Sequence, residues 1–146
     1  MLNRRQFLAA ALYTVPTLRP QMVARPEWGA PILDIHSHLR QGPDANVTHM
    51  DGCGVTHAVL LARSSAGEQV KAIQAKHPKR FEWAASADIT RPEAADLLTK
   101  AVKDGAIGLG EIKFRVEADG PELRRMYALA AELNVPILVH FQEVPH

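Results

Sequence analysis

Five short apolar segments alternate along the chain with longer segments of mixed polarity. The apolar segments are rich in aliphatic and β-branched residues and comprise residues 32–36, 57–62, 81–87, 106–114 and 136–141. Because strands that alternate with helix-length segments commonly form parallel sheets, the pattern predicts an α/β fold with about five strands and four helices. Right-handed crossovers place consecutive strands side by side. An open doubly wound sheet and part of an eight-stranded barrel both fit this pattern.

The segment 121–133 has the clearest helical periodicity. Its apolar residues recur every three or four positions, at Leu123, Met126, Tyr127, Ala130 and Leu133. Residues at this spacing share one face, so the segment predicts an amphipathic helix that packs against the sheet. Capping boxes are predicted at the start of this helix, with Asp119 and Glu122, and at the start of the preceding helix, with Thr90 and Glu93.

Composition and charge are those of an ordinary globular protein with at most one domain. Of the 146 residues, 47% are hydrophobic and 23% are charged, and the formal net charge is +1. A chain this close to neutrality has no strong field to attract nucleic acid or an anionic membrane, and no apolar run approaches the roughly 18 residues of a membrane-spanning helix. The single cysteine, Cys53, has no partner for a disulfide within the chain and is expected to be a small buried residue in a turn.

The first 25 residues resemble a bacterial export signal. The pair Arg4-Arg5 stands before a short alanine-rich apolar stretch, as in signals of the twin-arginine type. A frayed amphipathic helix is the alternative interpretation of this segment. Prolines mark residues 26–31 as a linker, which leaves residues 32–146 as the folded domain. The leader predicts export, to the periplasm of a bacterium.

The strongest local motif is Asp34-Ile35-His36-Ser37-His38, at the end of the first predicted strand. Alternate residues of a strand point to the same face, so His36 and His38 are expected to reach one ion together, with Asp34 on that face as a partner of an imidazole. Neutral imidazole is a common zinc ligand. Two hydrogen-bonded histidines without an ion are the alternative.

Two further predicted strands end in side chains that bind metals. The fourth carries Glu111 and Lys113 near its end, and the fifth ends at His140. The carboxyl ends of parallel strands meet at one edge of the sheet, where barrel enzymes gather their catalytic residues. The sequence therefore predicts a divalent metal site at that edge. The other histidines of these segments are expected to have structural roles: His49, His57 and His77.

The order of the motifs DIHSH, GEIKF and PILVHF, at intervals of one or more βα units, resembles the amidohydrolase superfamily, in particular its amidohydrolase-related or decarboxylase-like branch. The resemblance covers most of the chain after the linker. It implies a distorted (β/α)₈ barrel with one or two divalent ions, usually zinc. Carried over by position, the ligands are His36 and His38 on the first strand and His140 on the fifth. On the fourth strand the resemblance implies Glu111 as a bridging ligand, or Lys113 as in members that use a carboxylated lysine.

The same resemblance implies a metal-dependent hydrolase in which a metal-activated water attacks a carbonyl or ester-type small molecule. Decarboxylation at the same centre is the alternative reaction. In this family an aspartate that ends the eighth strand completes the site, and here it would lie beyond His146. Because a complete barrel takes about 250 residues, the domain is expected to be the N-terminal half of a barrel, with little activity alone.

A half-barrel leaves two strand edges unpaired, and unpaired edges promote association. The second hypothesis is therefore a non-catalytic product that self-associates through these edges or binds metal without turnover. Arg115, which follows the fourth predicted strand, would meet an anionic substrate or remain solvated in its loop.

Overall fold

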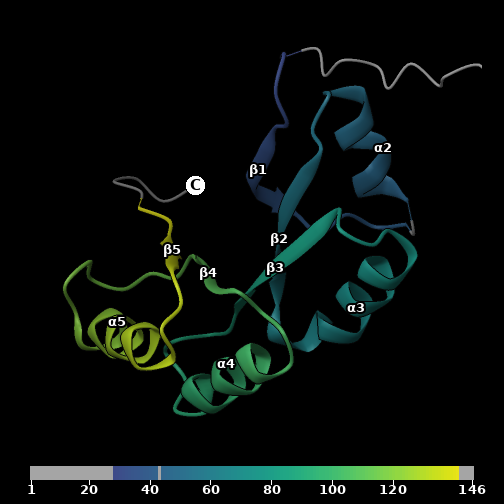
Figure 1. The fold of residues 1–146 in the computed structure, drawn as a ribbon. Coiled ribbons are helices and arrows are strands. Elements are labelled where there is room, and N and C mark those ends of the chain that lie inside the picture. Colours follow the sequence, from purple (N-terminus) through teal and green to yellow (C-terminus); the bar gives the residue numbers. More distant parts are fainter. Residues whose placement is uncertain (1–27, 43, 142–146) are drawn as a thin grey trace, which may run out of the picture.

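The computed structural model describes residues 28–42 and 44–141. Within these residues the chain forms an α/β structure, in which five parallel strands make one sheet in the order β1-β2-β3-β4-β5 and four helices lie against it (Figure 1). Each strand pairs with its neighbours in the sequence, which confirms the predicted topology. The predicted leader, residues 1–25, and the start of the linker lie outside the described residues.

The strands are β1 (Leu33–His38), β2 (His57–Arg63), β3 (Phe81–Ser86), β4 (Gly108–Ile112) and β5 (Ile137–Val139). The helices are α2 (Ala45–Gly52), α3 (Gly67–Lys76), α4 (Ala94–Lys103) and α5 (Pro121–Leu133), and a 3₁₀ turn, η1 (Ser64–Ala66), leads from β2 into α3. The predicted helix 121–133 is confirmed at both ends, and the ends of the predicted strands shift by no more than two residues. None of the described helices is both long enough and apolar enough to cross a bilayer.

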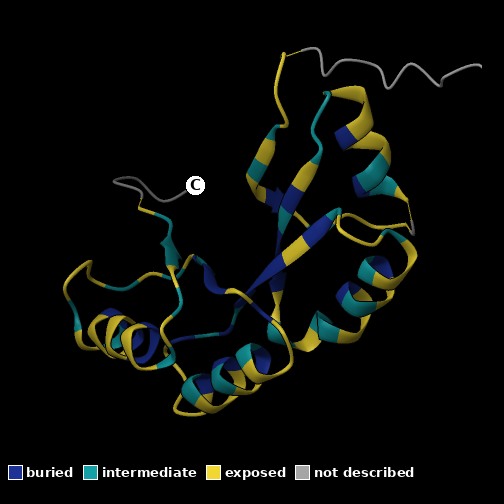
Figure 2. Ribbon diagram, viewed as in Figure 1, coloured by how far each residue is buried: buried dark blue, intermediate teal, exposed yellow. Residues whose placement is uncertain are grey.

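One face of the sheet packs against the helices and forms the hydrophobic core (Figure 2). Alternate residues of β2 and β3 line this helix-covered face: Ala58, Leu60, Ala62, Phe81, Trp83 and Ala85. The helices contribute side chains with no exposed surface: Met50, Val70, Leu98 and Met126. Burial of one large aliphatic side chain contributes about 1.5–3 kcal/mol, so this layer supplies most of the stability of the fold.

The opposite face of the sheet is concave, because the sheet curls into half of a barrel. Two strands separate β1 from β4, and in a flat sheet this arrangement would place them about 14 Å apart. On the concave face, however, His38 of β1 lies 3.5 Å from Glu111 of β4. Leu61 and Ala84, which pair across β2 and β3, are buried outside the helix-packed core and form the floor between these two side chains.

A bulge interrupts β1 in the middle of the histidine motif. Asp34 pairs with Ala58 and Ser37 pairs with Leu60, so three steps along β1 match two steps along β2. The extra residue reverses the alternation of side chains. The strand partners of Asp34 and Ser37 are Ala58 and Leu60, which both point to the helix-covered face. Asp34 and Ser37 therefore lie on that face, whereas His38 lies on the concave face. The prediction that Asp34 shares a face with the histidines is therefore wrong.

Both predicted capping boxes are also wrong. Thr90 does not cap α4, because its hydroxyl donates to the carboxylate of Asp88 and the helix begins later, at Ala94. The next helix begins at Pro121, whose ring fixes φ at a helical value and which has no N–H to satisfy. The chain therefore enters α5 without a side-chain hydrogen bond from Asp119.

Cys53 is exposed, which corrects the prediction of a buried residue. It follows α2 at the surface, where its backbone N–H donates to the carbonyl of Met50. Its own carbonyl accepts a hydrogen bond of 3.3 Å from the indole of Trp28. The turn is thus held by the backbone of Cys53, and the thiol is left at the surface.

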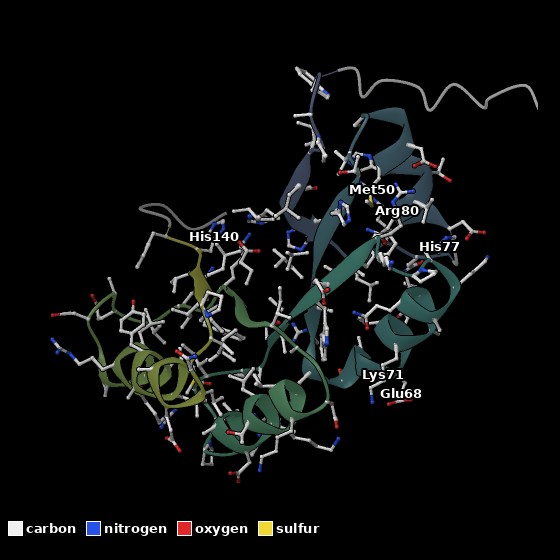
Figure 3. The ribbon with its side chains drawn as sticks, in the orientation of Figure 1. Met50, Glu68, Lys71, His77, Arg80 and His140 are labelled. Carbon is white, nitrogen blue, oxygen red and sulfur yellow. The ribbon has the colours of Figure 1, made fainter. Side chains whose placement is uncertain are left out.

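Ionic contacts join the start of α2 to the end of α3. Asp44 precedes α2, and its carboxylate accepts hydrogen bonds of 2.9 Å from both Lys76 and His77. His77, at the end of α3, is labelled in Figure 3. The hydrogen bonds from Lys76 and then His77 hold the pKa of Asp44 below its ordinary value of 3.8. Arg80 makes a similar link, with a 2.7 Å contact to the carboxylate of Asp51 near the end of α2. These contacts tie the two ends of α2 to the segment that runs from the end of α3 to β3.

Candidate metal centre

The carboxyl ends of β1 and β4 bring two imidazoles and one carboxylate together on the concave face. Glu111 Oε2 lies 3.6 Å from His36 Nε2 and 3.5 Å from His38 Nε2. One ligand atom from each of the three residues lies within 4.8 Å of the others. The two imidazole rings meet edge to face, with centroids 5.2 Å apart. Three of the four residues that the sequence predicts as ligands therefore lie at one place.

The separations suit two ligands of one ion better than direct hydrogen bonds. At 3.5 and 3.6 Å, the nitrogen–oxygen distances are too long for good hydrogen bonds. Two ligands bound to one tetrahedral zinc ion, at about 2.0–2.1 Å each, lie about 3.3–3.4 Å from each other. Two imidazole nitrogens and a carboxylate oxygen are also donors that zinc accepts. The donor set therefore fits a divalent ion of this kind.

His140 contacts the same carboxylate through its other oxygen. Its Nδ1 lies 2.6 Å from Glu111 Oε1, at hydrogen-bonding distance. The backbone N–H of His140 donates to the carbonyl of Ile112 at 3.0 Å, which fixes the residue beside the end of β4 (Figure 3). His140 is not one of the three residues whose ligand atoms lie within 4.8 Å of one another. Its observed contact is with the candidate ligand Glu111.

A glycine before Glu111 lets β4 and β5 approach each other closely. At Gly110 φ is +146°, and a Cβ there would lie 2.8 Å from both the Cβ and the carbonyl oxygen of Leu138. Because no side chain fits that space, glycine is required at this position. The close approach of the strands in turn brings the carboxylate of Glu111 within reach of His140.

Glu111 is the most buried member of the cluster. Its side chain is 7% exposed, whereas those of His36, His38 and His140 are 47%, 65% and 29% exposed. A buried carboxylate is costly unless a cation or hydrogen-bond donors compensate its charge. Among the described residues, no lysine or arginine lies within ion-pair distance of Glu111, and its contacts are the three histidines. A cation placed between the exposed imidazoles and Glu111 would compensate this charge.

The other residues considered as ligands or partners do not join the cluster. Lys113 lies beyond the end of β4, is exposed, and bonds no other described residue. The carboxylate of Asp34 accepts a 2.9 Å hydrogen bond from the backbone N–H of His36, not from an imidazole. His49 lies in α2 and His57 lies at the start of β2. Both are exposed, and neither belongs to the cluster. The structure thus brings Glu111, rather than Lys113, to the histidines.

Comparison with known proteins assigns no family to the chain. No protein-family model matches it, and no curated protein matches it either. The sequence motifs and the geometry of the centre are therefore the basis for a functional assignment.

Proposed function

We propose that this protein is a metal-dependent hydrolase of the amidohydrolase superfamily, with a half-barrel of the TIM type. The observation that carries the proposal is the convergence of His36 Nε2 and His38 Nε2 on one oxygen of Glu111, at 3.6 and 3.5 Å. The cluster lies at the carboxyl ends of parallel strands, where barrel enzymes have their active sites. The motifs DIHSH, GEIKF and PILVHF, which carry these residues in order, support the same assignment.

The ligands of a zinc ion in this proposal are His36 and His38, through their Nε2 atoms, and Glu111, through Oε2. A bound divalent ion lowers the pKa of a coordinated water toward about 7 and polarises a substrate carbonyl or ester oxygen. Glu111 contributes the negative charge among the three proposed ligands. Its side chain is 7% exposed and lies 3.6 and 3.5 Å from the imidazoles of His36 and His38. Leu61 and Ala84, which are both buried, lie on the two strands that separate β1 from β4.

His140 holds the second oxygen of Glu111 and fixes its orientation. The 2.6 Å contact joins Nδ1 of His140 to Oε1 of Glu111, and Nε2 is the other nitrogen of the ring. In a centre with one ion, His140 is a positioning residue for Glu111. In a centre with two ions, Nε2 of His140 is also a ligand, so a zinc content of one or two per chain distinguishes these forms.

Zinc binding by the full chain tests the proposed centre. We expect equilibrium dialysis followed by elemental analysis to give at least one zinc per chain for the wild type, and none above background for the double variant His36→Ala/His38→Ala. The matched control is His49→Ala/His57→Ala, which removes two exposed histidines outside the cluster and should keep the wild-type zinc content. Equal zinc content in both double variants would overturn the assignment of ligands.

Hydrolysis of an activated ester tests the reaction class. With p-nitrophenyl acetate as the probe, we expect only a small rate above buffer, because a half-barrel should have little activity alone. Zinc should support this rate, a chelator should remove it, and His36→Ala/His38→Ala should lack it. Zinc binding through these histidines without any metal-dependent hydrolysis would retain the metal centre but contradict the proposed activity. Export through the leader is part of the same proposal, and replacement of Arg4 and Arg5 by lysine should then leave the protein in the cytoplasm.

A second function, self-association without turnover, is favoured by apolar side chains on an edge strand. Leu33 and Ile35 are 59% and 61% exposed, and in the described sheet β1 pairs with a strand on one side only. Exposed apolar residues beside an unpaired strand edge promote association. Sedimentation velocity over a wide concentration range tests this function: oligomers that grow with concentration support it, and a monomer throughout excludes it.

A further inference from the structure

Three arginine side chains in the described part of the chain make no hydrogen bond or ion pair, and all three follow the carboxyl ends of strands. They are Arg40 after β1, Arg63 at the end of β2 and Arg115 after β4. The other described arginines each contact a carboxylate or a backbone carbonyl: Arg80, Arg91, Arg124 and Arg125. The unpaired guanidinium groups thus lie at the edge of the sheet that carries the metal centre.

Strand pairing fixes the position of Arg63 relative to that centre. Arg63 pairs with Ser86, and it lies two residues beyond Leu61, which pairs with His38. Residues two apart in a strand share a face, so Arg63 lies on the concave face with His38. With strands about 4.8 Å apart and a rise of about 3.3 Å per residue, the Cα of Arg63 lies about 8 Å from that of His38. An arginine side chain and a small bound molecule together span this distance.

The charge of Arg63 has no close counter-ion among the described residues. The charge of Arg63 acts on Asp88, but the pKa of Asp88 is lowered first by the hydrogen bond from Thr90 and only last by Arg63. Arg91 is the arginine that lies within ion-pair distance of Asp88, at 3.8 Å. The guanidinium of Arg63 therefore remains exposed at the end of β2, with its donors available to a ligand.

We infer that Arg63 binds a carboxylate of the substrate while the metal centre acts on a carbonyl or ester group of the same molecule. The guanidinium presents a planar pair of donors that matches a carboxylate, and such charge-assisted pairs are among the stronger hydrogen bonds. The sequence contains neither a glycine-rich dinucleotide-binding motif after the first strand nor a P-loop, so these two common phosphate-binding motifs are absent. The inference rests on the proposed function and names its substrate class: small carboxylic acids. Arg63 is a specificity residue in this assignment.

Binding of simple aromatic probes to the full chain tests the inference. Benzoate carries the carboxylate, benzamide is its neutral analogue of the same shape, and phenyl phosphate carries a different anion. Titrations followed by two-dimensional NMR should show benzoate binding more tightly than benzamide. Arg63→Gln should weaken benzoate binding about tenfold or more, as expected for loss of a charge-assisted bidentate contact, and should leave benzamide binding unchanged.

The matched control is Arg124→Gln, which removes the same charge from the outer helix α5 and should bind benzoate like the wild type. Circular dichroism should show both variants folded, because both side chains are exposed. Equal benzoate affinity in wild type and Arg63→Gln would overturn the inference and identify Arg63 as a solvated surface residue. Preference for phenyl phosphate that depends on Arg63 would also overturn it, because the site would then be a phosphate site.

Zinc content separates the failure of this inference from failure of the proposed function. Arg63 is not a ligand, so Arg63→Gln should bind as much zinc as the wild type. Normal zinc binding with benzoate affinity independent of Arg63 would refute the substrate class alone. Benzoate binding that depends on Arg63 in a protein that binds no zinc would refute the proposed hydrolase and support an anion site at the end of β2.

Discussion

Leu60 and Leu61 are neighbours in β2 that show how the two faces of the sheet differ. Leu60 is completely buried in the core beneath the helices, whereas Leu61 is buried on the concave face, opposite His38. The helix-covered face contains aliphatic and aromatic side chains and provides stability. The concave face contains few apolar side chains in its floor and the polar cluster at its carboxyl edge. The comparison indicates that stability and the proposed metal binding would depend on different residues of the same strands.

The largest expected effect is on stability, for Leu60→Ala. Removal of a large buried aliphatic side chain typically costs about 2–5 kcal/mol, through lost burial and the cavity that remains. We expect Leu61→Ala to cost less, because among residues 28–42 and 44–141 no helix packs over that side of the sheet. Urea unfolding, monitored by circular dichroism and extrapolated to water, gives both free energies of unfolding.

Zinc affinity of the folded protein completes this comparison. Leu60→Ala should leave zinc affinity unchanged once the folded fraction is taken into account. Leu61→Ala should weaken it, since Leu61 supports the backbone position opposite His38. If the two alanine variants lost equal stability and equal zinc affinity, the proposed division between the two faces would be wrong.

The second-largest expected effect is a loss of zinc affinity in the variant His140→Asn. This change removes the hydrogen-bond partner of Glu111 Oε1, and loss of a group that orients a metal ligand typically reduces affinity about 10–100-fold. The free energy of unfolding without metal should also fall, because the hydrogen bond from His140 helps to compensate the buried carboxylate of Glu111. Competition with a chromophoric chelator measures the affinity, and His57→Asn is the control with an exposed histidine. Unchanged zinc affinity in His140→Asn would remove His140 from the centre.

The smallest expected effect is a pH-dependent loss of stability in the variant Asp44→Asn, which removes a charge from the outer surface. The folded pKa of Asp44 is lowered by its bonds to Lys76 and His77, so its contribution to stability is present above the ordinary value and is lost as pH falls through the folded value. The urea midpoint of the variant should therefore lie slightly below that of the wild type at neutral pH. The difference should disappear well below pH 3.8, the ordinary value for this carboxyl.

The control for this effect is Glu82→Gln, which removes an exposed carboxylate of β3 that bonds no other described residue. It should show no such change of the urea midpoint with pH. A difference between Asp44→Asn and the wild type that persists unchanged at acid pH would show that packing, rather than charge, links α2 to α3.

The strand order and the amphipathic helix could be predicted because they depend on residue periodicity. Of the five residues predicted on one helix face, Leu123, Met126 and Ala130 are buried and Leu133 is partly buried, whereas Tyr127 is 37% exposed. The convergence of His36, His38 and Glu111 could be predicted as well, because carboxyl ends of parallel strands share an edge. These features follow from rules that apply along every strand and helix of this class.

Other features could not be predicted because they depend on single local contacts. The bulge in β1 moves Asp34 to the helix-covered side, and nothing in the alternation of residues indicates it. Threonine is a residue type that commonly caps helices, but the hydroxyl of Thr90 donates a hydrogen bond to the carboxylate of Asp88 and does not cap α4. The hydrogen bond between Glu111 and His140 requires the close approach at Gly110, for which a glycine beside a strand-ending glutamate is the only signal in the sequence.

The contact between β1 and β4 across the concave face has a consequence for the kinetics of folding. His38 and Glu111 come from strands with two βα units between them, so closing this contact carries a large loop entropy. Pairing of β2 and β3 with their neighbours shortens the effective loop, and contacts of high sequence separation form late in such folds. The ligand set would therefore assemble only after the intervening sheet has formed and curled. Zinc uptake during refolding would report completion of the fold, later than signals from the helices.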